Sequence, residues 1–318
     1  MEPLLRPLSP SDFPALSALS AEAFGAAIPQ TEWPWKYERN PFRAPSLVAE
    51  LEGTPVAFFG GWATRYRGAG LDAPGVAAVD VMSGRAARAL GRGSVFRSLG
   101  LAFFEANGAA GAPFVFGFPN DRHRKTGERL LDYVEVERCG ELEIAPEGLP
   151  GGRRAPLRRV ERGGSFGRGH ASLAEVLHAR AGFRTDRSAS TLDWRFRMRP
   201  GVDYDVFRLL DLFGRSRGYA VVRAAGPLAR LVDLQARDES GADLPDLLAA
   251  VRAALPAGTT LVTLRAPRAG LLARRLVEEL GFREGASDCS LTVRRLRDGV
   301  DLDAARGFDY RFADHDIF

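Results

Sequence analysis

The segment Arg88-Ala89-Leu90-Gly91-Arg92-Gly93 has the residue types and spacing of an anion-binding loop. It lies between an apolar run, Val76 to Met82, which predicts a strand, and a run from Ser94 to about Asn107, which predicts a helix. Glycines at this spacing let backbone amides approach a ligand without interference from a Cβ atom. The first turn of the helix adds unpaired N–H groups and the positive end of the helix dipole. The segment therefore predicts a pyrophosphate cradle.

Other phosphate-binding loops do not fit this segment. A Walker loop requires a Gly-Lys-Ser/Thr ending, and a dinucleotide-binding fingerprint requires G-x-G-x-x-G close after the first strand of a βαβ unit. An ordinary glycine-rich turn is the alternative interpretation, because the chain holds 35 glycines and 44 basic residues, so a chance match is plausible.

The elements that position the loop follow from the hydrophobic pattern. A strand is expected at Leu4 to Leu8, and a helix at Phe13 to Phe24 after a capping segment. Two strands joined by a tight turn are expected at Ser46 to Glu50 and Pro55 to Tyr66. After the loop and its helix come an apolar strand, Phe114 to Phe118, then Pro119-Asn120, and a last helix and strand through Leu131 to Val136.

This order, with R-x-x-G-x-G between a strand and a helix, resembles the GNAT N-acyltransferase superfamily over about the first 138 residues. Phe116-Gly117-Phe118-Pro119-Asn120 is similar to the "GFPN" strand end of a subset of bacterial GNAT proteins. The resemblance implies that acetyl-CoA, or another acyl-CoA, binds as co-substrate, with Asn120 facing its pantetheine arm. The residues implied for its cradle are Arg88, Gly91, Arg92, Gly93 and Ser94. For Pro119-Asn120 the alternative is an ordinary strand end, since Pro-Asn is common turn chemistry.

The second half of the chain repeats the alternation of strands and helices. Helices are expected at Asp243 to Ala254 and Leu271 to Leu280, and a last strand at Ser290 to Leu296. Its order resembles a second GNAT module, although Gln235 to Ala242, where the cradle belongs, is degenerate. We therefore expect an α+β chain of two GNAT-like modules, each a mixed, mostly antiparallel sheet flanked by helices. The expected boundaries are 1–138 for the acyl-CoA-binding domain, 139–169 for a Gly- and Arg-rich linker, and 170–318 for a degenerate GNAT-like domain.

The resemblance also implies the chemistry of the site. GNAT enzymes transfer an acyl group by direct attack of an amine in a ternary complex. A backbone N–H near Val81 and Met82 would polarise the thioester oxygen, and Asp80 would take the proton from the amine. In the alternative interpretation Asp80 merely alternates outward on a half-exposed strand.

The usual proton donor, a Tyr on the helix after Asn120, is missing. His123 is the candidate substitute, with a solvated histidine at the helix start as the alternative. The cations Arg122, Arg124, Lys125 and Arg129 would contact the 3′-phosphate of CoA or an anionic acceptor.

Composition limits the remaining classes. The net charge is +4, but basic and acidic residues are mixed along the chain, so no nucleic-acid partner is expected. Two distant cysteines and four scattered histidines predict neither a disulfide framework nor a metal site. Without a signal-peptide pattern or an apolar stretch long enough to span a bilayer, a cytoplasmic protein is expected. The oligomeric state is left open.

The expected acceptor is the primary amine of a small polar molecule, because Trp33, Trp35, Lys36 and Tyr37 follow the first helix, where GNAT acceptor loops usually lie. These aromatics can equally form a loop that caps the core. Trp194 and Arg195 present the same choice between an acceptor groove and core packing. Two other functions stay open: a non-catalytic acyl-CoA-binding or scaffold module, and a tRNA-dependent aminoacyltransferase of the peptidoglycan-bridge type.

Overall fold

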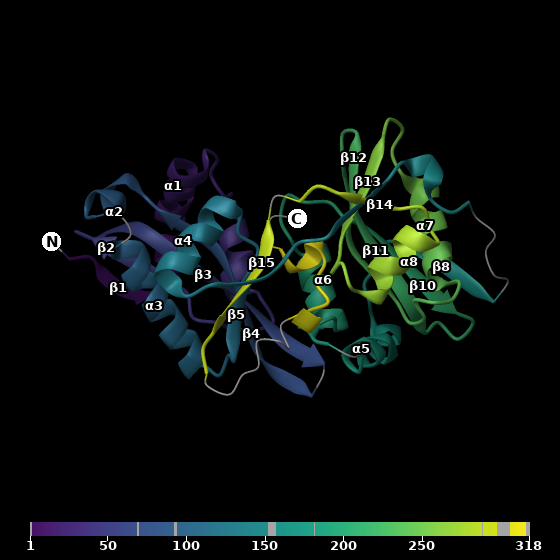
Figure 1. Cartoon of the computed structure of the whole chain (residues 1–318), viewed down its shortest axis with the longest axis horizontal. Helices are drawn as coiled ribbons and strands as arrows, with labels where there is room; N and C mark the ends of the chain where they lie inside the picture. Colours follow the sequence, from purple (N-terminus) through teal and green to yellow (C-terminus); the bar gives the residue numbers. More distant parts are fainter. Residues whose placement is uncertain are drawn as a thin grey trace. The chain divides into compact units, whose positions relative to one another are not determined.

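The computed structural model describes residues 2–68, 70–91, 94–151, 157–180, 182–287, 289–297 and 306–315. The chain forms two compact units, and each is assembled from separate stretches of sequence (Figure 1). The first comprises Met1–Tyr66, Asp72–Glu137 and Cys289–Ala305; the second comprises Arg67–Leu71, Arg138–Asp288 and Arg306–Phe318.

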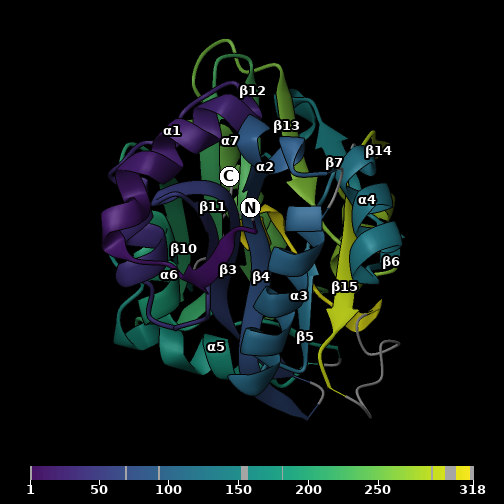
Figure 2. The same ribbon diagram turned by 90° about the vertical axis from the view of Figure 1, so that its left-hand side faces the viewer.

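The sheet of the first unit has the strand order β1-β2-β3-β4-β5-β15-β6. The pairs β1–β2, β2–β3 and β5–β15 are antiparallel, whereas β4–β5 is parallel. The strands are β1 (Leu4–Pro7), β2 (Leu47–Leu51), β3 (Thr54–Gly68), β4 (Leu71–Ser83), β5 (Phe114–Gly117), β6 (Val134–Arg138) and β15 (Ser290–Arg295). The helices are α1 (Phe13–Phe24), α2 (Arg85–Ala89), α3 (Ser94–Ala109) and α4 (Asp121–Leu131) (Figure 2).

Helices cover both faces of this sheet because successive residues of a strand point to opposite faces. On β3, Phe58 packs with residues of α1, and its neighbour Phe59 packs with residues of α3. The core therefore has two layers, one under α1 and one under α3. This arrangement fixes β4 and β5 between two packed faces.

The sheet of the second unit has the order β14-β7-β13-β12-β11-β10-β8. The β12–β13 pair is parallel, whereas β8–β10, β10–β11, β11–β12, β13–β7 and β7–β14 are antiparallel. The strands are β7 (Glu141–Ile144), β8 (Arg158–Arg162), β10 (Asp205–Asp211), β11 (Ser216–Ala225), β12 (Leu228–Ala236), β13 (Leu261–Arg265) and β14 (Arg283–Gly285); the two-residue β9 (Arg184–Thr185) is not part of this sheet. The helices are α5 (Ala171–His178), α6 (Ala189–Arg197), α7 (Asp243–Ala254) and α8 (Leu271–Glu278).

The two units exchange one strand, which corrects the expected boundaries. β15, expected in the second module, lies between β5 and β6 of the first sheet. The expected linker 139–169 instead contains β7, which lies between β13 and β14, and β8, which forms an edge of the second sheet. In β7 the side chains of Leu142 and Ile144 alternate with glutamates and enter the second core. The short alternation was hidden by the Gly- and Arg-rich sequence that follows it.

None of the helices in the described part of the chain combines the length and apolar character needed to cross a membrane. Among the same residues, no group of three or more His, Cys, Asp or Glu side chains is arranged to hold a metal ion.

Candidate active site

The candidate site begins where β4 and β5 separate. Their parallel pairing joins Val76 to Val115 and Ala77 to Phe116, after which β4 runs on to Ser83. Two helices start beyond the carboxyl ends of these strands, α3 at Ser94 and α4 at Asp121. Helix N-termini carry unpaired N–H groups and the positive end of the dipole, so this edge of the sheet favours an anion.

The sequence-predicted amide donors lie on the part of β4 that runs beyond its printed pairing with β5. Val81 is half-buried and packs against the α3 side of the core, whereas Met82 is buried on the α1 side. Their side chains therefore point to opposite faces of the sheet at the end of β4. This places their backbone, rather than their side chains, beside the opening between the two strands.

The predicted cradle segment is partly described. Gly91 has a φ of 125°, a conformation that favours glycine, and its carbonyl accepts a hydrogen bond of 3.3 Å from the N–H of Ser94. Arg92 and Gly93 lie outside the described residues. This hydrogen bond places Gly91 close to the first residue of α3.

Arg88 belongs to the short helix α2, an element that the sequence pattern did not predict. Its guanidinium donates to the carbonyl of Ser83 and lies 3.3 Å from a carboxylate oxygen of Glu22 on α1. Its side chain is 53% exposed. Arg88 thus has local partners, and it stays accessible enough to exchange them for a phosphate.

Asn120 acts as the N-cap of α4. Its side-chain oxygen accepts a 3.0 Å hydrogen bond from the N–H of His123, and its backbone has the extended conformation typical of a cap. This geometry explains the Pro-Asn pair as a strand end followed by a helix start. The residue is exposed at the carboxyl end of β5, as a contact to a pantetheine arm requires.

Asp80 is held in a buried polar triad. Lys36 Nζ lies 3.0 and 2.8 Å from its two carboxylate oxygens, and the Tyr37 hydroxyl donates to Oδ2 at 2.5 Å. Asp80 has a φ of 50°, an uncommon conformation for a residue other than glycine, and this breaks the regular alternation of β4. Gly60 on β3 makes room for the triad, because a Cβ atom there would overlap the Tyr37 hydroxyl.

The sequence identified the three residues of the triad as candidates but did not predict their contact. Asp80 was singled out on the strand, and Lys36 and Tyr37 in the aromatic segment, but nothing local joins residues more than forty positions apart. The contact changes the interpretation of Asp80, because a neighbouring cation stabilises a carboxylate in its ionised form. A proton accepted here has to be accommodated beside the lysine.

His123 lies in an aromatic setting rather than in the solvated one considered as the alternative. Its ring stacks on Tyr133 with centroids 6.2 Å apart and meets the edge of Phe96 at 5.8 Å. Burial lowers the pKa of His123, so the ring is mainly neutral near pH 7. A neutral imidazole accepts a proton more readily than it donates one.

Tyr133 was missed as a functional candidate. Its ring lies over Gly127 of α4, where a Cβ atom would overlap it. The Tyr133 hydroxyl is buried, and no hydrogen-bond partner for it is present among the described residues. Burial raises the pKa of Tyr133, so the hydroxyl keeps its proton at neutral pH. The signal in the sequence was the glycine at the position where the family carries its tyrosine.

The aromatic segment contributes to the core. Trp33 is 1% exposed, stacks between Phe13 and Tyr37, and donates from Nε1 to the Ser17 hydroxyl at 2.8 Å. For Trp33 the structure therefore favours core packing over an acceptor groove. Trp194 is likewise buried, at 4% exposure.

In the corresponding loop of the second unit, the backbone amides already bind a side-chain carboxylate of the same loop. After β12, the carboxylate of Asp238 accepts hydrogen bonds from the N–H groups of Ser240 and Gly241 at 2.9 and 3.0 Å, and from the Ser240 hydroxyl at 2.7 Å. These bonds lower the pKa of Asp238. The amides that would face a phosphate are thus satisfied by a side chain of the same loop.

No protein-family model and no curated protein matches the sequence. Solved structures do match over nearly the whole chain. A probable N-acyltransferase from Enterococcus faecalis V583 superposes with a TM-score of 0.71 at 12% identity, covering 93% of this chain and 73% of that one. A GCN5-related N-acetyltransferase from Kribbella flavida gives 0.68 at 17% identity, covering 93% and 72%.

A tandem GNAT protein from the clavulanic acid biosynthesis pathway gives a TM-score of 0.59 at 12% identity, covering 94% of this chain and all of that one. The chain therefore has the tandem GNAT fold. The expected fold class, α+β with two mostly antiparallel sheets flanked by helices, is confirmed.

Proposed function

We propose that this tandem GNAT chain is an N-acyltransferase that moves an acetyl or other short acyl group from acyl-CoA to the primary amine of a small polar acceptor. The observation that supports it most directly is the separation of β4 and β5, with two helix N-termini beyond their carboxyl ends and Gly91 hydrogen-bonded to the first residue of one of these helices. A pyrophosphate needs such a set of backbone donors and dipole ends.

We assign the cofactor contacts to the residues that the sequence predicts. The amides around Gly91, Arg92, Gly93 and Ser94 take the pyrophosphate, and the exposed Arg88 supplies a cation. Asn120 would contact the pantetheine arm at the end of β5, and the β4 backbone at Val81 and Met82 would face the thioester. Donors fixed before the reaction stabilise the oxyanion that forms when the amine attacks.

Proton transfer in this proposal uses Asp80 as the base and Tyr133, which follows α4, as the acid. The ionised carboxylate of Asp80 accepts the proton of the attacking amine, directly or through water, while Lys36 and Tyr37 hold it in place. For protonation of the thiolate, Tyr133 is a better candidate than His123, because burial keeps the phenol protonated and the imidazole neutral.

The cofactor proposal is tested by titrating the full chain with CoA. Gly91→Asp places a carboxylate and a strained backbone at the cradle, and we expect CoA affinity to fall at least about tenfold. The matched control is Gly25→Asp, because Gly25 is also left-handed, at a φ of 81°, and has open space around it. Equal CoA affinity in the wild type and in Gly91→Asp would contradict the assignment.

Catalysis is tested by release of free thiol from acetyl-CoA in the presence of a panel of primary amines. Thiol release that requires an amine supports acyl transfer. CoA binding without turnover on any amine favours the second candidate function, a non-catalytic acyl-CoA-binding module. That candidate draws on one observation, the ion pair that already engages the carboxylate of Asp80.

A further inference from the structure

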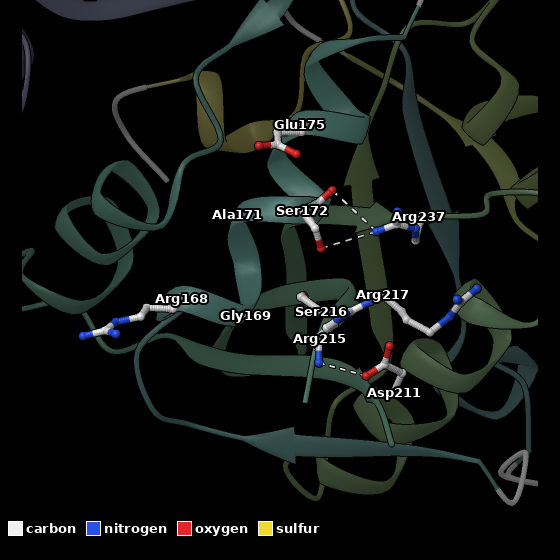
Figure 3. A pocket seen from close by; sticks show the side chains of 10 residues that line it. All are labelled: Arg168, Gly169, Ala171, Ser172, Glu175, Asp211, Arg215, Ser216, Arg217 and Arg237. Atoms are coloured by element: carbon white, nitrogen blue, oxygen red, sulfur yellow. Dashed lines mark hydrogen bonds between the residues drawn. The ribbon is translucent and has the colours of Figure 1, made fainter. Parts of the chain in front are cut away.

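The second unit contains a pocket of about 560 Å³ whose walls are rich in arginine. It is bordered by the start of α5, by the turn between β10 and β11, and by the residues at the end of β12 (Figure 3). Its charged lining residues are Arg168, Arg215, Arg217 and Arg237 against Asp211 and Glu175. A volume in this range suits a small molecule, and the surplus of positive charge favours an anion.

Arg237 is the most informative of these arginines. Its Nη1 atom donates hydrogen bonds of 3.5 Å to the carbonyl and to the hydroxyl of Ser172, both at the outer limit for such a bond (Figure 3). Within the described residues, no carboxylate pairs with it. Arg217 differs, because Asp243 binds its guanidinium through two bonds of 3.1 Å. Arg237 is thus a half-buried guanidinium whose donors are weakly engaged.

The two carboxylates in the lining do not compensate for this charge equally. Asp211 Oδ1 accepts the backbone N–H groups of Phe213 and Arg215 at 2.9 Å each, so this carboxylate is directed into its own turn. Glu175 is exposed on α5 and is the negative charge that an incoming anion would meet. Arg168 and Arg215 are exposed, and neither forms an ion pair within the described part of the chain; they raise the positive potential of the pocket.

The shape of the pocket depends on a close approach of two backbone segments. A Cβ atom at Gly169 would lie 2.5 Å from the carbonyl oxygen of Gly214 in the β10–β11 turn. The glycine therefore lets the segment before α5 touch this turn, which brings the first turn of α5, with Ser172, opposite Arg237. The dipole of α5 adds to the attraction for an anion at this point.

We propose that this pocket binds the phosphate of a phosphomonoester, with Arg237 and the Ser172 hydroxyl as its contacts. A guanidinium and a hydroxyl match the several oxygen acceptors of a phosphate, and the surplus of positive charge suits its double negative charge. The remaining volume accommodates an attached group such as a nucleoside. The inference is independent of the acyl-CoA cradle, which lies in the first unit.

Inorganic phosphate is the first probe, titrated into the full chain by calorimetry at constant ionic strength. We expect Arg237→Ala to weaken phosphate binding at least about tenfold, and Arg237→Lys to weaken it less. Glu175→Gln removes the opposing charge and should tighten binding about twofold to fivefold, a gain that misfolding cannot imitate. The control is Arg197→Ala, an exposed arginine of the same unit outside the pocket, which should leave affinity unchanged.

Three further ligands separate the sources of the signal. AMP should bind at least as tightly as phosphate, and adenosine and acetate should bind weakly. Acetate binding as strong as phosphate, or equal phosphate affinity in wild type and Arg237→Ala, would overturn the proposal. CoA also carries a phosphomonoester; CoA binding that is lost in Arg237→Ala but kept in Gly91→Asp would support this pocket and refute the cradle of the first unit.

Discussion

Variants of the ion pair between Lys36 and Asp80 can separate the contribution of Asp80 to folding stability from its proposed role as the catalytic base. Its nearest atoms are 2.8 Å apart, and the two side chains are 4% and 5% exposed. At an effective dielectric constant of about 20, charges this close attract by about 6 kcal/mol, and the desolvation of both groups offsets most of that attraction. The net contribution of the intact pair to stability is therefore small, although breaking it is costly.

We expect Lys36→Met or Asp80→Asn alone to lower the free energy of unfolding by about 3–5 kcal/mol, because each leaves one charge of the pair buried without the other. The double variant carries neither charge, and its stability should return to within about 1–2 kcal/mol of the wild type. Urea denaturation of the four proteins measures both effects as a double-mutant cycle.

The double variant also tests the catalytic role of Asp80, because we expect it to be folded although it lacks the carboxylate. If Asp80 accepts the proton of the amine, thiol release should fall by roughly 10²–10⁴-fold while CoA affinity stays unchanged. Full turnover in the double variant would remove the role of base from Asp80. Additive losses of stability in the cycle would refute the ion pair itself.

Three further outcomes can be checked by unfolding experiments. Gly127→Ala should lower the free energy of unfolding by about 1–3 kcal/mol, because the new methyl group overlaps the ring of Tyr133. Gly108→Ala on α3 is the matched control: its new methyl group meets its nearest atom at 3.5 Å, so the free energy of unfolding should rise by about 0.5–1 kcal/mol. Burial lowers the pKa of His178 from 6.5 to about 4, so the unfolded chain takes up this proton first as the pH falls. Stability should fall from about pH 6.5 towards pH 4, by roughly 3 kcal/mol for this group, and the slope should flatten in His178→Gln. A chain of residues 1–138 lacks β15 and should not unfold cooperatively, whereas adding 289–297 through a flexible linker should restore a transition.

Local structure was largely readable from the sequence. The helices α1 and α7 begin and end at the predicted residues. In α7 the buried side chains of Leu244, Leu247, Leu248 and Val251 recur at the helical period, and the first residue is an aspartate, which suits a helix N-terminus. Period, turn residues and end signals are local properties, so a single sequence is enough to place such elements.

Partner choice was not readable in the same way. The alternation of Glu141 to Ile144 shows which face of a strand is buried, but it does not specify the sheet that accepts it. The same holds for β15, whose residues pair with β5 across separations of 175 to 181 positions, from Thr292 with Gly117 to Arg295 with Phe114. The triad of Asp80 has this character too, because its contact depends on how the segment after α1 folds back onto β4. A pairwise contact between distant segments requires the assembled fold.

The two units show why a shared strand order does not decide ligand binding. Both place a loop and a helix after a strand that pairs in parallel with the next strand of the core, β4 in the first unit and β12 in the second, which is where backbone amides can meet an anion. In the second unit the spacing Asp238-Glu239-Ser240-Gly241 lets the first carboxylate fold onto the amides two and three residues later. This internal anion competes with any phosphate for the same donors and is always at high local concentration. Asp238→Ala would free these amides, so phosphate binding that appears with this change and persists when Arg237→Ala is added would show that the carboxylate, and not the fold, keeps these amides from binding an anion.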